Sequence, residues 1–233
     1  MLLTHTETKY KQMRTKTLLL TAALSVAGIA TSMAQVYSVN AVGYVNVPLV
    51  GNGFTLVANQ FTASSYAISN VIPSAPLGAT VFVFVGGTYQ STVFDEFTSA
   101  WDKPNTQLPL GSGFFINNPQ PATTLTMVGE VPQGTLNNSI SSGFSIRSSI
   151  VPQAGTVGAL GLVPGLGDVV FKFDSATQGY LQATFDEFGG GWVANTSGFV
   201  VDNANGPSVA VGEAVFYNSI ANTATWNRTF NVN

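Results

Sequence analysis

Apolar and polar residues alternate along much of this chain with the two-residue period of a β-strand. Residues 37–47 place apolar side chains on one face and polar ones on the other (Tyr37, Val39, Ala41, Val45 and Val47 against Ser38, Asn40 and Asn46). Residues 81–85 are continuously apolar, Gly86 and Gly87 suit the positive φ angles of a tight turn, and residues 88–94 return, which predicts a hairpin. Helical periodicity is nearly absent. The pattern therefore predicts an all-β protein.

The same pattern occurs twice. Residues 89–97 (YQSTVFDEF) are followed four positions later by Trp101, and residues 180–188 (YLQATFDEF) are followed four positions later by Trp192. The tyrosine, the FDEF tetrapeptide and the tryptophan are all displaced by 91 positions. Self-similarity of this kind is typical of tandem structural repeats. We expect two pseudo-symmetric antiparallel modules, each a β-sandwich or small barrel of about six or seven strands.

The repeat also predicts the domain boundaries. After a leader, the first module is expected over residues 35–131 and the second over residues 132–233. Residues 127–131 (MVGEV) resemble residues 41–45 (AVGYV). A strand near residues 123–131 is therefore expected to close the first module and to open the second.

Residues 1–34 have the pattern of a signal peptide. A basic stretch that begins at Met13 precedes an apolar run over residues 18–30, and small residues follow at Ser32 and Ala34. The run is shorter than the roughly 20 residues that span a bilayer. Met13 is also an alternative start of translation. We expect an exported protein that is extracellular, on the cell surface or periplasmic, with no membrane span in the mature chain.

The composition of the mature chain excludes several classes of function. It contains no histidine and no cysteine, and it carries four cations against ten carboxylates. Four scattered cations cannot neutralise a run of phosphates, so nucleic acid is not an expected partner. Disulfides, zinc–thiolate sites and the common nucleophile–base pairs are excluded as well.

Three segments carry a resemblance to known proteins. Residues 36–47 (VYSVNAVGYVNV), residues 111–115 (GSGFF) and the doubled FDEF resemble an uncharacterised family of secreted bacterial proteins. They are also similar to small β modules of bacterial surface proteins, in which a Gly-Phe strand precedes a hairpin and a Gly-x-Gly-Phe-Phe strand. The first resemblance covers essentially the whole mature chain. It implies a secreted, duplicated β protein and no particular activity.

Two acidic doublets are the candidates for metal or acid–base chemistry, Asp95-Glu96 and Asp186-Glu187. Carboxylates that face each other can hydrolyse glycosides, and hard oxygen ligands can hold Ca²⁺. Neighbouring residues on a strand point to opposite faces, however, so one doublet cannot form such a pair by itself. The alternative interpretation is structural, with each aspartate capping a turn.

The phenylalanines around these doublets favour the structural interpretation. Phe94 and Phe97 lie three positions apart, as do Phe185 and Phe188, which indicates that the chain turns there. We expect all four rings to be largely buried. No cofactor is expected, with Ca²⁺ as the one alternative.

The candidate ligand-binding residues fall into two groups. Trp101 and Trp192 could stack on sugar rings, although identical placement in both copies favours a role in the core. The second group lies among ten extra residues within 193–208 of the second copy. The structural interpretation of this segment is a longer tether or an extra edge strand, and the functional one is a contact surface for a neighbouring copy or a glycan. The contact residues of that segment would be Phe199, Asp202, Asn203 and Asn205.

These features favour a secreted noncatalytic structural or adhesive protein of the cell envelope or extracellular matrix that associates with itself. Only 8% of the residues are charged and 45% are hydrophobic, so few charges are available to keep β edges apart. A carbohydrate-binding protein is the alternative. A glycan hydrolase that depends on carboxylates alone is the second alternative.

Overall fold

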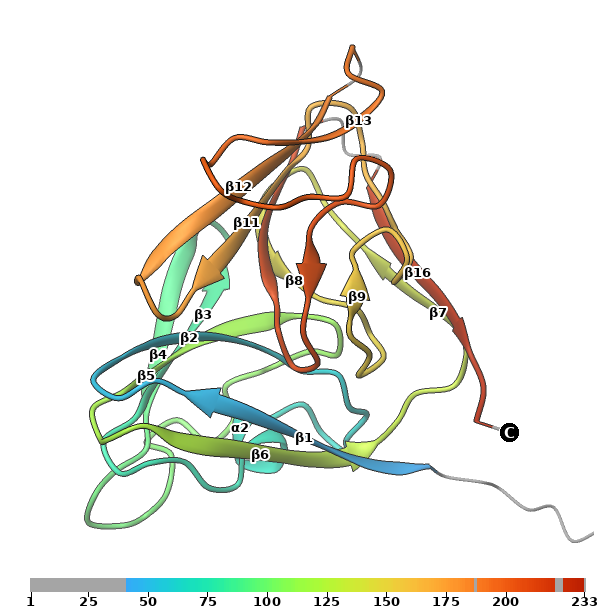
Figure 1. Ribbon diagram of the computed structural model, residues 1–233. Coiled ribbons are helices and arrows are strands. Elements are labelled where there is room, and N and C mark those ends of the chain that lie inside the picture. Colours follow the sequence, from blue (N-terminus) through green and yellow to red (C-terminus); the bar gives the residue numbers. More distant parts are fainter. Residues whose placement is uncertain (1–40, 187, 221–223, 233) are drawn as a thin grey trace, which may run out of the picture. The chain divides into compact units, whose positions relative to one another are not determined.

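The computed structural model describes residues 41–186, 188–220 and 224–232 (Figure 1). In these ranges the chain forms antiparallel β-strands joined by turns, with one short helix, α2 (Ile68–Val71). The predicted all-β fold of sandwich-like modules is confirmed. The predicted signal peptide, residues 1–34, lies outside the described residues.

The first half of the fold, residues 42–130, contains a sheet and a two-stranded ribbon. The sheet has the strand order β2-β5-β3-β4, and the ribbon pairs β1 with β6. The strands are β1 (Val42–Leu49), β2 (Gly53–Ala58), β3 (Thr80–Val85), β4 (Thr88–Val93), β5 (Gly113–Asn118) and β6 (Thr123–Glu130).

The second half, residues 134–230, contains a sheet of order β8-β15-β11-β12-β13 and a smaller sheet of order β10-β16-β7. A short pair, β9 with β14, lies beside them. The strands are β7 (Gly134–Ser139), β8 (Gly143–Arg147), β9 (Gly155–Thr156), β10 (Leu162–Val163), β11 (Val169–Asp174), β12 (Gly179–Asp186), β13 (Gly191–Ala194), β14 (Ser208–Val209), β15 (Val215–Ser219) and β16 (Thr225–Phe230).

The two larger sheets have corresponding strand orders and registers. Taken along the chain, β2, β3, β4 and β5 correspond to β8, β11, β12 and β15, and β13 is an additional edge strand. The registers match residue by residue: Phe82 pairs with Phe115 on β5, and Phe171 pairs with Phe216 on β15. Position-by-position comparison of the halves is therefore possible.

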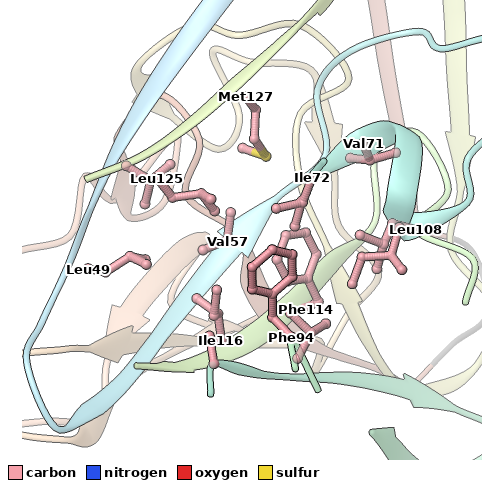
Figure 2. Close-up of a cluster of buried hydrophobic side chains, with 14 of the residues drawn as sticks. Leu49, Val57, Val71, Ile72, Phe94, Leu108, Phe114, Ile116, Leu125 and Met127 are labelled. Carbon is pink, nitrogen blue, oxygen red and sulfur yellow. The ribbon is translucent and has the colours of Figure 1, made fainter. Parts of the chain in front are cut away.

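The central strands of each larger sheet, such as β3 and β5 of the first, are apolar at successive positions, so both faces of the sheet are covered there, whereas the edge strand β4 is mostly exposed. One face of the first sheet packs against the β1–β6 ribbon around Val57, Phe114 and Met127, as Figure 2 shows. One face of the second sheet packs in the same manner around Val170, Tyr217 and Trp226. Burial of these apolar side chains is the main source of stability in both halves.

The remaining faces of the two sheets pack against each other. Leu56 and Phe115 of the first sheet and Ile146 of the second form a third buried cluster, joined by partly buried phenylalanines from both. We call this contact the aromatic interface. Figure 1 shows the β3–β4 hairpin beside the β11–β12 hairpin along it. The described residues belong to one compact unit, so the boundary between residues 131 and 132 stays a prediction.

The junction between the halves differs from the expectation of one shared strand. β6 pairs with β1, so that Met127 faces Val45 and Gly129 faces Gly43. The two similar segments of the sequence are therefore partners within the first half. The second half begins with a separate strand, β7, which pairs with β16. The prediction of one strand closing the first module and opening the second is wrong.

Among the described residues, no helix is long and apolar enough to cross a membrane.

Candidate functional site

The aromatic interface is built from residues at equivalent positions of the two sheets. Strand alternation directs every second side chain of β3 and of β11 toward it. Phe84 contacts Phe216 and Phe115 contacts Phe173, both with ring centroids 5.1 Å apart and nearly perpendicular planes. Edge-to-face pairs at this separation add to the free energy of area burial. The two contacts are copies of each other, because Phe84 corresponds to Phe173 and Phe115 to Phe216.

The repeated tyrosines Tyr89 and Tyr180 meet at this interface. A side-chain hydrogen bond between the two phenols contributes to the pKa of both. Burial raises the pKa of Tyr89, and burial together with the neighbouring Tyr89 raises the pKa of Tyr180 to about 12. Both phenols are therefore neutral at ordinary pH. The pair can offer hydroxyl groups to a ligand but no charge.

A groove of about 550 Å³ opens beside this pair. We call it the tyrosine groove. Tyr89, Tyr180 and Phe54 are 48%, 45% and 38% exposed, so their rings are accessible to a small molecule. The groove is lined by Phe54, Phe82, Tyr89, Phe115, Phe173, Gln178 and Tyr180. An apolar concave surface with a few polar groups at defined places is the usual form of a small-molecule site.

The turn between β11 and β12 closes one side of the tyrosine groove. The Gln178 side chain accepts a hydrogen bond from the Phe54 backbone N–H at 2.9 Å and donates one to the Phe54 carbonyl at 3.0 Å. Its backbone φ of +55° places it at the end of the turn, and the Asp174 carboxylate stabilises that turn by accepting from Ala176 and Thr177. These bonds lower the pKa of Asp174. The amide that borders the groove is therefore held in place by both halves.

The structure places the two candidate tryptophans in the cores instead of at a ligand site. Trp101 and Trp192 are 5% and 3% exposed. The Trp101 indole donates to the Ile72 carbonyl at 2.7 Å and packs edge-on against Phe94, and Trp192 packs against Phe185 in the same manner. Because neither ring presents a face to solvent, the interpretation of these residues as sugar platforms is corrected.

The four phenylalanines around the acidic doublets divide into two kinds. Phe94 is buried, and Phe185 is partly buried against the second core. Phe97 and Phe188, however, are 95% and 96% exposed. The expectation that all four are largely buried is wrong for the second ring of each tetrapeptide. The turn that follows each aspartate directs that ring away from the core.

The aspartates of the doublets cap turns. The Asp95 carboxylate accepts hydrogen bonds from the backbone N–H groups of Phe97 and Thr98, which lower its pKa. Asp186 accepts from the Phe188 N–H at 3.0 Å. Glu96 is exposed, and Glu187 lies outside the described residues. Over the described ranges, no group of three or more histidines, cysteines or carboxylates is placed to hold a metal ion.

The ten extra residues of the second half pack on its core. The Trp192 backbone N–H donates to the Asn203 carbonyl at 2.7 Å, and the Gly158 N–H donates to the Asn205 carbonyl at 2.7 Å. Phe199 packs against the second core, and Asp202 accepts from the N–H groups of Ala204 and Asn205. The segment covers Trp192, and the Asn205 side-chain amide also donates to Asp202, although Asp202, Asn203 and Asn205 are exposed. The segment is thus an additional structural cover of the second core, and its interpretation as a contact surface for a neighbouring copy or a glycan stays a prediction.

Sequence reasoning missed the tyrosine groove. The signal was present in the alternation of β3, where Phe82 and Phe84 stand between Val81, Val83 and Val85. A strand that is apolar on both faces needs a second covering layer. The recurrence of Tyr89 as Tyr180 then identifies residues that border that layer in both copies.

No family model matches this chain, and neither a curated protein nor a solved structure matches it.

Proposed function

We propose that this protein is a noncatalytic, exported adhesive protein that binds a neutral sugar residue in the tyrosine groove. The proposal depends on one observation: exposed aromatic rings from both halves of a tandem repeat converge on a groove that also contains phenol and amide groups. The apolar C–H face of a pyranose stacks on such rings, and its hydroxyls bond to Tyr and Gln side chains.

The chemistry around the groove supports binding without catalysis. The described residues that line it include no carboxylate, whereas glycoside hydrolysis uses a pair of them. The aspartates of the repeated doublets accept hydrogen bonds in turns and are therefore already in use. The hydrolase alternative has no candidate pair at this site.

A titration tests the proposal. The chain without its predicted signal peptide (the processed chain, from residue 35) is titrated calorimetrically with cello-oligosaccharides and malto-oligosaccharides. The variants Tyr89→Ala and Tyr180→Ala are titrated in the same way. Each variant should weaken binding about tenfold or more, which corresponds to about 1.4 kcal/mol. Tyr44→Ala is the matched control, because Tyr44 is 71% exposed on β1 and does not line the groove. Undiminished binding by both groove variants would contradict the proposal.

Self-association is the second candidate function, and the exposed Phe97 and Phe188 favour it. Two fully exposed phenylalanines at equivalent turns are unfavourable in water unless another surface covers them. Phe97→Ser, Phe188→Ser and the double variant should shift sedimentation toward the monomer with unchanged thermal stability. A wild-type chain that sediments as a monomer at all accessible concentrations would exclude this function.

A further inference from the structure

A second groove lies at the aromatic interface, at the position that corresponds to the tyrosine groove with the roles of the halves exchanged. The tyrosine groove lies between Phe54 of β2 and the β11–β12 hairpin, and the second groove lies between Phe144 of β8 and the β3–β4 hairpin. Phe54 and Phe144 are equivalent, because each pairs with the corresponding asparagine of its sheet, Asn117 or Asn218. The second groove has a volume of about 640 Å³.

The two grooves differ first in the turn that borders them. In the tyrosine groove, the longer turn carries Gln178, whose amide is bonded to Phe54. In the second groove, the turn is Gly86-Gly87, with φ angles of +59° and +82°. A Cβ atom built on either glycine would meet nothing within 4 Å. The short turn therefore leaves this side of the second groove open.

The grooves differ also in charge, because the second one is lined by Arg147. We call it the arginine groove. The guanidinium is partly buried, and its hydrogen bonds go to neutral oxygens, Ser145 Oγ at 3.2 Å and Asn138 Oδ1 at 3.3 Å. Asn138 is itself fixed, since its amide donates to the Gly111 carbonyl at 2.7 Å. Arg147 is thereby oriented by its neighbours without being neutralised.

No carboxylate within the described residues pairs with Arg147. The ion pair found among the described residues involves a different cation, Lys172, whose ammonium lies 3.2 Å from the Glu213 carboxylate. A partly desolvated cation without a counter-ion is unfavourable, and burial lowers the pKa of Arg147. This is notable in a chain with more carboxylates than cations, because a partner for Arg147 would be easy to supply. An anionic ligand would provide the missing charge.

The other lining residues indicate what carries that anion. The Phe144 ring is 51% exposed and stacks on Phe216 at 5.4 Å, so one of its faces is supported from behind. Ser141 and Ser145 also line the groove and bring hydroxyl groups to it, and the Ser145 hydroxyl is hydrogen-bonded to Arg147. A ligand that fits has an apolar ring face, hydroxyl groups and a carboxylate on one ring. Those are the properties of a uronic acid residue.

We propose that the arginine groove binds a uronate residue of an acidic glycan, with its carboxylate on Arg147 and its ring on Phe144. The guanidinium can hold a carboxylate through two parallel N–H···O bonds, which a neutral sugar cannot form. The inference goes beyond the proposed function, because it concerns a different groove and a charged ligand.

The test compares uronate and neutral oligosaccharides of the same length, by calorimetry on the processed chain. Oligogalacturonate should bind at least tenfold more tightly than the neutral galactose oligomer, and added NaCl should weaken its binding. Arg147→Gln should remove that preference. Lys103→Gln is the matched control, since it removes the same charge from an exposed lysine outside the groove and should change nothing.

Further variants separate the alternatives. Phe144→Ala should weaken uronate binding even if Arg147→Gln fails to fold, because the Phe144 ring is half-exposed and belongs to none of the buried clusters. Benzoate serves as the probe for an aromatic acid, and benzoate binding as tight as that of the uronate would overturn the sugar assignment. Equal affinity for acidic and neutral oligomers, or a Phe144→Ala variant that binds as the wild type does, would overturn the proposal. Gln178→Ala, which changes the lining of the tyrosine groove alone, should leave uronate binding intact, so the two grooves can fail independently.

Discussion

The two halves of the molecule fill one equivalent buried position with different side chains. Ala79 of the first half and Asp168 of the second are equivalent, because each carbonyl accepts from the backbone N–H of the first phenylalanine of FDEF, at 2.8 and 2.9 Å. Both residues are fully buried. Tyr217, which is hydrogen-bonded to Asp168, corresponds to Ile116 of the first half, and both residues are buried. One half therefore uses an apolar pair where the other uses a carboxylate and a phenol.

The polar pair is tolerated because its hydrogen bonds are satisfied. The Asp168 carboxylate accepts from the Tyr217 hydroxyl at 2.6 Å, from the Gly165 N–H at 2.8 Å and from the Ile220 N–H at 2.6 Å. Burial, together with the bond to Asp168, raises the pKa of Tyr217 above its usual range. The shared fold therefore requires buried side chains at this place in both halves. In the second half, the Asp168 carboxylate also holds the loops at Gly165 and Ile220 in position.

The largest effect is expected from breaking this network on one side. Asp168→Ala leaves two buried donors, the Tyr217 hydroxyl and the Gly165 N–H, and the partly buried Ile220 N–H without their acceptor, and it should cost roughly 4–6 kcal/mol of unfolding free energy. The double variant Asp168→Ala with Tyr217→Ile copies the first half and should recover part of that loss, because the phenol no longer needs a partner. Urea unfolding of the single and double variants measures both. A double variant less stable than Asp168→Ala would show that the halves are not interchangeable here.

The next effect separates the two copies of the FDEF tetrapeptide. Phe94→Ala should cost roughly 3–5 kcal/mol, because the ring is buried and packs against Trp101. Phe185→Ala should cost clearly less, since that ring is only partly buried. Thermal and urea unfolding of the two variants give the comparison. Equal losses would mean that partial exposure of Phe185 has no energetic consequence.

A smaller loss of stability is expected from a change in the ten extra residues of the second half. Gly206 has a φ of +79°, and a Cβ atom there would lie 2.9 Å from the Trp192 ring. Gly206→Ala should therefore cost roughly 1–3 kcal/mol. Gly190→Ala is the control, because it shares a positive φ but has nothing within 4 Å of its Cβ position. A loss no greater than that of the control would show that the segment does not press on Trp192.

The smallest effect concerns pH and the tyrosines of the interface. The pKa of Tyr180 is raised from 10.0 to about 12, so the neutral phenol is favoured in the folded state. Its contribution to stability is complete below about pH 10 and is lost as the pH rises toward 12. Unfolding followed across this window should show a decline that is smaller in Tyr180→Phe. An identical decline in that variant would assign the effect to other groups.

Strand alternation was sufficient to predict the β fold, because period-two patterning follows from backbone geometry. It also predicted the hairpin at Gly86-Gly87, which the structure contains between β3 and β4. The exposure of Phe97 and Phe188 could not be predicted, because it depends on where an aspartate-capped turn directs the next side chain. Both grooves were missed for a related reason. Their residues come from opposite halves and meet only through packing between sheets, which local pattern does not encode.

The exchange of roles at the aromatic interface has a consequence for symmetry. The Phe84–Phe216 and Phe115–Phe173 contacts, at the same separation of 5.1 Å, are related as the two halves of an isologous contact in a C2 homodimer are. One half of the chain thus carries both surfaces of the contact. A chain that ended near residue 131 would hold the complementary surface for a second copy of itself. Two such chains side by side would reproduce, as separate subunits, what the intact protein joins covalently between β6 and β7.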